Sequence, residues 1–166
     1  MKIVVDCMEP ITMVHHLKQL GCDVRVEDVR PPHGKGGDYV LGHGKVGIER
    51  KHMRDLLLSL IQKRKGTQSI HLFEQLTLLE KNYDTPILLI EGDYPNWDSS
   101  EKECSFPLPP IRPANKEPIT YRLHHNAFFG GFIWCIRNSI YLVHTTDERE
   151  SARFIYLYAK KLEGLS

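Results

Sequence analysis

The sequence predicts an α/β fold with a mixed central sheet flanked by helices on both faces. Three observations support this: short β-branched runs alternate with segments of helical period, one apolar run is continuous, and two extended segments flank a glycine-rich turn. Of the 166 residues, 41% are hydrophobic and 26% charged, which excludes disordered, collagen-like and transmembrane classes. The 22 Lys and Arg residues nearly balance 21 Asp and Glu, so a polyanionic partner would need a local basic cluster.

The N-terminal segment predicts a strand, a helix and a second strand. Ile3–Val5 is a short β-branched run, and apolar residues then recur at helical spacing from Ile11 to Leu20, where Gly21 ends the helix. Valines alternate with charged residues over 24–29, the pattern of a half-buried strand.

A β-hairpin is predicted next, after a turn-rich break at 31–37. Its strands are Asp38–Leu41 and Lys45–Arg50, joined through Gly42-His43-Gly44, because glycines supply the positive φ that tight turns need.

The middle of the chain predicts two helices and a buried strand. From His52 to Ile61 the apolar residues follow the helical period, and a second helix is predicted over about 69–83. Residues 87–90 are continuously apolar, which is typical of a strand buried on both faces.

Residues 92–123 carry six of the ten prolines and no clear period, so we expect a long loop or insertion there. Regular structure is predicted to resume with a helix over 127–137, a strand over 140–143 and a closing helix over about 148–162. The whole chain, 1–166, is therefore expected to form a single domain.

Several kinds of site are excluded by their missing patterns. No G-x-G-x-x-G follows the first strand and no G-K-[ST] is present, which excludes dinucleotide-binding and P-loop sites. The adjacent histidine pairs cannot both face one ion, and no C-x-x-C offers a zinc site. No cysteine has the spacing of a nucleophile with a histidine base. The four scattered cysteines, the early charge at Asp6 and the absence of a long apolar run favour an intracellular protein outside any membrane.

The predicted hairpin brings together the residues that indicate a metal-dependent catalytic site. Asp38 opens one strand and Glu49 lies near the end of the other, so the two carboxylates can converge on Mg²⁺, or Mn²⁺ in its place. Lys51 projects from the same strand face as Glu49, where an ammonium can hold the attacking water or neutralise charge that develops on phosphorus. Asp55 follows one helical turn later, and either positions Lys51 or reaches a second metal or its water shell.

Basic residues cluster beside this predicted metal site. Residues 49–65 hold six basic and two acidic side chains, a local charge of +4 where a phosphate backbone would lie. The predicted DNA-binding residues are Arg50, Arg54, Lys63, Arg64 and Lys65. For Arg50 a salt bridge to Asp55 and an anchoring role for the loop or a phosphate both remain open.

The closing helix is apolar on two sides. One stripe runs from Ala152 to Leu162, and Phe154, Leu157 and Tyr158 form a second. Because a core of this size has limited room for both stripes, we expect the second one to meet a partner.

The string Gly37-Asp38, Glu49-Arg50-Lys51 and Asp55 resembles the G-D…E-R-K-x-x-x-D signature of XPF-family structure-specific endonucleases, including the archaeal XPF and Hef proteins. The likeness continues through most of the chain outside about 93–122, for example at Ile90-Glu91-Gly92 and Phe129-Gly130-Gly131. The resemblance implies a restriction-endonuclease-like fold, and metal binding by Asp38 and Glu49.

It also implies that Lys51 lies in the catalytic centre and that Arg50 and Asp55 support it. The family often opens with Asp-x-Arg-Glu, whereas this chain has Asp6-Cys7-Met8-Glu9, so the acidic pair is kept and the arginine is replaced by Met8. For Asp6 and Glu9, support of the active site and capping of the following helix remain equal alternatives.

For the whole molecule, the resemblance implies cleavage of branched DNA, such as flaps and forks, near a single-strand junction. It implies a homodimer through the C-terminal region. Because this sequence contains neither a helix-hairpin-helix nor a helicase domain, a heterodimer with a related subunit or with a helix-hairpin-helix protein is the alternative. It also implies a DNA repair or recombination setting, in the cytoplasm or nucleoid of a prokaryote or virus or in a eukaryotic nucleus. The alternatives are a non-catalytic scaffolding subunit and a nuclease that acts on RNA or plain duplex.

Overall fold

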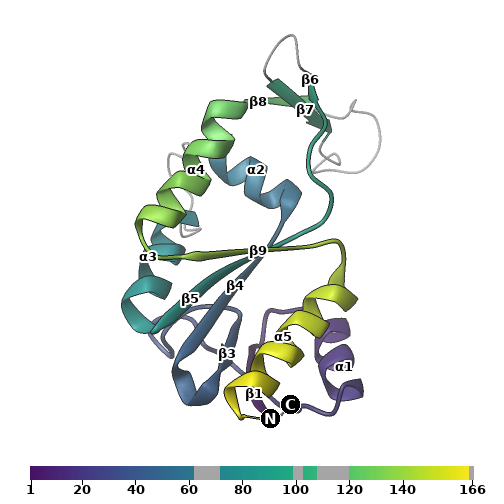
Figure 1. Cartoon of the computed structure of the whole chain (residues 1–166), viewed down its shortest axis with the longest axis vertical. Helices are drawn as coiled ribbons and strands as arrows, with labels where there is room; N and C mark the ends of the chain where they lie inside the picture. The colour runs from purple at the N-terminus through teal and green to yellow at the C-terminus, as the bar shows by residue number, and fades with distance from the viewer. Residues whose placement is uncertain (62–71, 99–102, 108–119, 165–166) are drawn as a thin grey trace.

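Six strands form the central sheet of the computed structural model, which describes residues 1–61, 72–98, 103–107 and 120–164 (Figure 1). Their order is β2-β1-β3-β4-β5-β9. The pairs β1–β2, β4–β5 and β5–β9 are parallel, whereas β3 is antiparallel to both of its neighbours. The mixed sheet that the sequence predicts is therefore confirmed. The strand bounds are β1 Lys2–Asp6, β2 Asp23–Glu27, β3 Tyr39–Leu41, β4 Val46–His52, β5 Thr85–Glu91 and β9 Tyr141–Thr145.

Helices cover both faces of this sheet, as Figure 1 shows. Two helices, α1 (Ile11–Gln19) and α5 (Glu148–Leu162), pack on one face over a core that includes Ile48 and Leu89. The other face is covered by α2 (Met53–Ile61), α3 (Leu72–Asn82) and α4 (His125–Arg137). Successive β5 side chains enter opposite cores, which is why its apolar run is continuous.

The hairpin that carries the predicted site is present. β3 and β4 pair antiparallel with Tyr39 opposite Ile48, and a single 3₁₀ turn, Gly42–Gly44, joins them. Because β3 also pairs with β1, the hairpin lies inside the sheet and not at its edge.

The described part of 92–123, for which a long loop or insertion is expected, contains strands that the sequence did not indicate. A second, three-stranded antiparallel sheet forms there from β6 (Trp97–Asp98), β7 (Glu103–Pro107) and β8 (Thr120–His124). These strands are short, and β7 ends in a proline, so they carry too little alternation to be recognised. The sheet lies beyond the α2–α4 layer, at the top of Figure 1.

Smaller differences concern the ends and the burial of elements. The helix predicted from residue 127 begins at His125, because the His124 Nδ1 accepts the Asn126 N–H and caps it. In β2, Val26 is 50% exposed, because this strand is an edge of the sheet. For the helix predicted over about 69–83, residues 69–71 lie outside the described residues, and α3 covers Leu72–Asn82.

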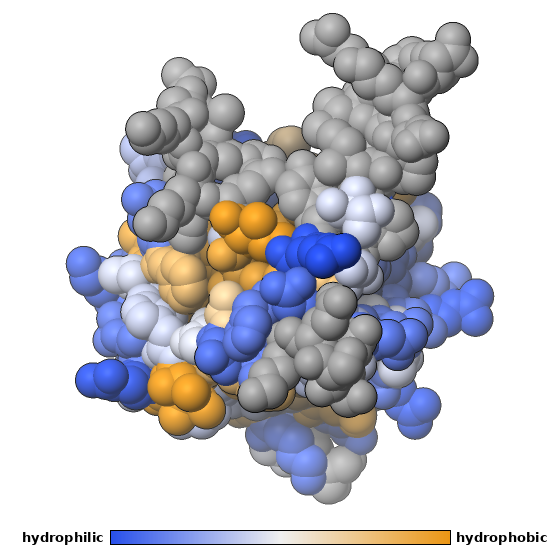
Figure 2. All heavy atoms as spheres, turned by 90° about the horizontal axis from the view of Figure 1, so that it is seen from above, coloured by the Kyte–Doolittle hydropathy of each residue, from blue (hydrophilic) through white to orange (hydrophobic). Residues whose placement is uncertain are grey.

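The molecule has two distinct ends along its long axis (Figure 1). The end that carries the second sheet is seen face-on in Figure 2, where apolar side chains gather beside hydrophilic ones. At the opposite end the N-terminus lies beside the end of α5, where the Met1 ammonium is 3.4 Å from a Glu163 carboxylate oxygen. Within the described ranges, no helix is both long and apolar enough to cross a bilayer.

Candidate active site

The backbone around Asp38 ties two strands of the sheet together. The Asp38 N–H donates to the Ile48 carbonyl at 2.7 Å, and the Asp6 N–H donates to the Asp38 carbonyl at 2.8 Å. Gly37 precedes it with φ +87°, and a Cβ there would lie 3.3 Å from the Ile48 carbonyl oxygen and 2.9 Å from a Leu79 methyl group. The Gly-Asp pair is thus required by geometry: glycine fits the tight backbone that presents the aspartate.

The Asp38 carboxylate lies beside β4. Its Oδ2 accepts the main-chain N–H of Arg50 at 2.7 Å. Burial raises the pKa of Asp38 well above its ordinary value, and the negative charges of Glu49 and Glu9 raise it further. Two carboxylates therefore share a low-dielectric site, which is electrostatically unfavourable without a cation.

Glu49 is the second of these carboxylates. Its side chain is 5% exposed, and burial raises its pKa to about 7. The Lys51 ammonium lowers that pKa, whereas the charges of Glu9 and Asp6 raise it. The charge of Glu49 in turn raises the pKa of Asp38, so the two carboxylates lie within electrostatic reach. Their shared role as metal ligands stays a prediction.

Lys51 is half-buried and donates from Nζ to Gln75 Oε1 on α3 at 3.4 Å. Asp55 is exposed in the first turn of α2, where a carboxylate favours the helix dipole. The partner that orients Lys51 is thus Gln75, and a catalytic role for Asp55 stays a prediction.

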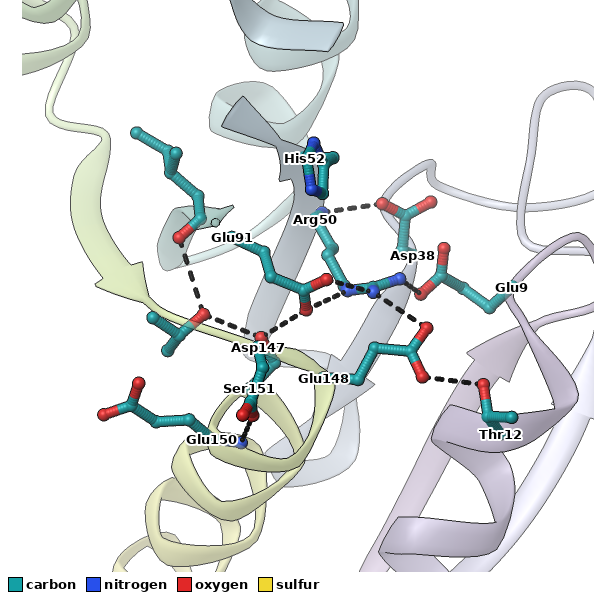
Figure 3. Close-up of polar contacts among 12 residues, drawn as sticks. Glu9, Thr12, Asp38, Arg50, His52, Glu91, Asp147, Glu148, Glu150 and Ser151 are labelled. Atoms are coloured by element: carbon teal, nitrogen blue, oxygen red, sulfur yellow. Dashed lines mark hydrogen bonds and ion pairs between the residues drawn. The ribbon is translucent and has the colours of Figure 1, made fainter. Parts of the chain in front are cut away.

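Arg50 points to the opposite face of β4, into a group of carboxylates (Figure 3). Its guanidinium binds Glu91 at two points, Nε to Oε2 at 2.9 Å and Nη2 to Oε1 at 2.7 Å. It also contacts Glu9 Oε2 at 3.2 Å and Glu148 Oε1 at 3.3 Å. In the described structure these three acids, and not Asp55, are the partners of the Arg50 guanidinium. An anchoring role of Arg50 for the loop or for a phosphate stays a prediction. Contact of Arg50 with DNA stays a prediction.

Glu9 and Asp6 bind different kinds of groups, because Glu9 contacts side chains and Asp6 accepts main-chain N–H groups. The Glu9 carboxylate accepts the Tyr39 hydroxyl and the Arg50 guanidinium, and burial raises its pKa. Asp6 is 2% exposed and accepts the main-chain N–H groups of Met8 at 2.8 Å and Val29 at 3.2 Å. Neither caps α1, which follows Pro10 without a side-chain cap. Glu9 thus supports the Arg50 cluster, and Asp6 holds the backbone after β1.

Met8 is 70% exposed, where the family pattern has an arginine. Its side chain therefore points to solvent, and only its main-chain N–H takes part in the site, through Asp6.

The donor set fits a hard divalent cation. Asp38 and Glu49 offer carboxylate oxygens from one hairpin, and burial raises the pKa of both, so a bound cation would stabilise their ionised forms. Of the predicted DNA-binding residues, Arg54 is half-buried on α2, the helix that follows β4. Lys63, Arg64 and Lys65 lie outside the described residues.

Glu91 is the site residue that sequence reasoning missed. It closes the apolar run of β5, is 5% exposed and also accepts the Ser151 hydroxyl at 2.7 Å. The available signal was an acidic residue at the end of a fully buried strand.

Similar chains are found among protein families and among solved structures. A family model described as ERCC4 domain matches residues 6–158. Among solved structures, XPF from Aeropyrum pernix is similar with a TM-score of 0.67 and 21% identity, over 97% of this chain and 64% of that chain. The same protein in complex with DNA gives a TM-score of 0.66 and 20% identity, over 98% and 64%. This chain therefore spans under two thirds of the length of those structures. No curated protein matches.

Proposed function

The chain belongs to the ERCC4 domain family, the family of XPF nuclease domains, and on that premise we propose that it is a metal-dependent endonuclease for branched DNA. The observation that carries the proposal is the buried pair Asp38 and Glu49, two carboxylates with raised pKa values beside Lys51. A non-catalytic chain has no need to keep two like charges in a buried position. Residues 1–166 act in this proposal as one nuclease domain.

Each side chain has a proposed role. Asp38 and Glu49 hold Mg²⁺, or Mn²⁺ in its place, as ionised carboxylates. Held by these two carboxylates, such a cation would polarise the scissile phosphate and would lower the pKa of a bound water. Lys51, oriented by Gln75, places a positive charge where charge develops on the phosphate oxygens.

The proposed substrate is DNA with a junction between single and double strands, such as a flap or fork. Binding relies on the phosphate backbone, with Arg54, Lys63, Arg64 and Lys65 as contacts. The structure of Aeropyrum pernix XPF in complex with DNA supports this substrate class by likeness of fold.

The proposed partner is a second copy of this chain or a related subunit, which meets α5. Leu157 is 47% exposed, and it lines a groove with Val143 and Arg153. Phe154 and Tyr158 are half-buried with ring centroids 5.8 Å apart, and they pack on the core beneath Leu157. The neighbouring edge strand β9 adds Tyr141, which is 60% exposed.

End-labelled flap, splayed-arm and plain duplex DNA, incubated with Mg²⁺ or Mn²⁺, test the proposal. We expect the wild type to cut branched DNA near the junction and Glu49→Gln to lose this activity by at least 100-fold. Glu80→Gln is the matched control, because Glu80 is an exposed acid on α3.

Two other results would redirect the proposal. Equal cutting of plain duplex, or cutting of an RNA of the same sequence, would replace the substrate class. Flap binding in a shift assay without cutting under any metal condition would favour a scaffolding subunit that needs an active partner.

A further inference from the structure

We propose that Glu91 and Ser151 are positioning residues of the metal site. They fix the Arg50 guanidinium on one face of β4, and through the main chain of Arg50 they fix the Asp38 carboxylate on the other. This inference rests on the proposed function, because it concerns the same metal ligands. Figure 3 shows Arg50 together with Glu91, Ser151 and Asp38.

The first step is the bond between Glu91 and Arg50. Both guanidinium contacts are short, 2.9 Å and 2.7 Å, and they form the two-point pairing that holds an arginine in one orientation. The side chains of Arg50 and Glu91 are only 11% and 7% exposed. Breaking a buried pair by removing one partner leaves an uncompensated charge, so this pair is fixed in the folded protein.

The second step is the support that α5 gives to Glu91. The Ser151 hydroxyl donates to Glu91 Oε2 at 2.7 Å and lies 2.7 Å from the Thr145 hydroxyl. Ser151 and Thr145 are both buried, so water does not compete for these bonds. The orientation of Glu91 is therefore set by α5 and by the end of β9.

The third step leads to the metal ligands. The Arg50 N–H donates to Asp38 Oδ2 at 2.7 Å. Side chains alternate along a strand, so Arg50 points to the α1–α5 face while its neighbours Glu49 and Lys51 point to the other. Fixing the Arg50 side chain thus fixes the strand segment that carries Glu49 and the amide that orients Asp38.

Glu148 joins the cluster from the first turn of α5. Its Oε1 lies 3.3 Å from Arg50 Nη2, and its Oε2 accepts the Thr12 hydroxyl of α1 at 2.7 Å. It is more exposed than Glu91 and binds Arg50 at one point only, so we assign the main positioning role to Glu91.

Residues that orient metal ligands typically change metal affinity by 10–100-fold when they are replaced. We therefore expect Glu91→Gln, which keeps the shape but loses the charge, to raise the dissociation constant for Mn²⁺ about 10-fold in calorimetric titration of the full chain. Ser151→Ala keeps the Arg50–Glu91 pair and is expected to give a smaller increase, roughly 3-fold. If Glu91→Gln fails to fold, Ser151→Ala still tests the inference.

Glu150→Gln is the control. Glu150 lies on the same helix and its carboxylate accepts the Thr146 N–H and hydroxyl at 2.7 and 2.8 Å, but it does not contact Arg50 in the described structure. We expect this variant to lower the melting temperature while leaving Mn²⁺ affinity within 2-fold of the wild type.

Cleavage by Glu91→Gln should return toward the wild-type kcat at saturating Mn²⁺, with an unchanged KM for DNA.

The inference is wrong if Glu91→Gln and Ser151→Ala bind Mn²⁺ as the wild type does, or if Glu150→Gln weakens binding equally. Because the titration needs no cleavage, a wild type that binds Mn²⁺ but cuts no DNA would overturn the proposed activity and still decide the positioning role. A wild type that binds no Mn²⁺ would overturn both.

Discussion

Lys51 and Glu49 face the same side of β4 and act on each other electrostatically. The Lys51 ammonium lowers the pKa of Glu49, but burial has the larger effect and raises that pKa to about 7. The carboxylate that we propose as a metal ligand therefore takes up a proton near neutral pH when no cation is bound.

This raised pKa makes the stability of the metal-free protein depend on pH. Between Glu49's ordinary value of 4.5 and about 7, the folded chain holds a proton that the unfolded chain has released. The free energy of unfolding should thus fall as pH rises through this window, by about 3 kcal/mol at roughly 1.4 kcal/mol per pKa unit. Asp38, whose pKa is also raised, acts in the same direction.

Urea unfolding at pH 5 and pH 8 measures this slope. Glu49→Gln should flatten it, and Mn²⁺ should stabilise the wild type more at pH 8 than at pH 5, because the ion competes with protons. Equal slopes for wild type and variant would contradict the raised pKa of Glu49.

Replacement of Lys51 tests its position in the site. Lys51→Met removes the charge that lowers the pKa of Glu49, so the acidic limb of the pH–rate profile should move to higher pH. The rate constant should fall on the order of 100-fold, as for other residues that stabilise developing charge. Lys45→Met, an exposed lysine of the same hairpin, is the control and should keep both the rate and the profile.

The proposed dimer depends on exposed apolar residues of α5. Leu157→Glu should shift the molar mass measured by light scattering from dimer to monomer, because a buried unpaired carboxylate opposes association. Ile11→Glu is the matched control, since Ile11 is 62% exposed on α1. A wild type that is monomeric under the same conditions would refute the dimer.

Gly47 lies directly against the ring of Tyr83, and a Cβ at Gly47 would fall 2.3 Å from a ring carbon. The Tyr83 hydroxyl donates to the Gly36 carbonyl at 2.7 Å, so the ring cannot move freely. Gly47→Ala should therefore lower the free energy of unfolding by about 1–3 kcal/mol. Gly130→Ala on α4, where a Cβ meets nothing within 4 Å, should instead stabilise the helix by up to about 1 kcal/mol in the same urea titration.

The parts of the site that sequence predicted are local in the chain. Asp38 and Glu49 belong to one hairpin, whose glycine turn and strand alternation determine that they meet. The central sheet and the helices on its two faces were predictable for the same reason, because each element shows its own period.

The parts that were missed depend on distant residues. Arg50 finds its partners 41 positions away at both Glu9 and Glu91 and 98 positions away at Glu148. No spacing rule reaches that far, so Asp55, a near neighbour in sequence, was the natural but unsupported candidate. The second sheet was missed because β6 has two residues and because prolines interrupt the region.

The alternation of Glu49, Arg50 and Lys51 across β4 limits how the sequence can change in length. One residue inserted or deleted between Val46 and Glu49 would turn the following side chains to the opposite face. The Arg50 guanidinium would then replace the Glu49 carboxylate at the proposed metal site, and the Glu49 carboxylate would enter the cluster around Glu91. Length variation in the hairpin should therefore be confined to the Gly42–Gly44 connection, which lies outside the strand pairing.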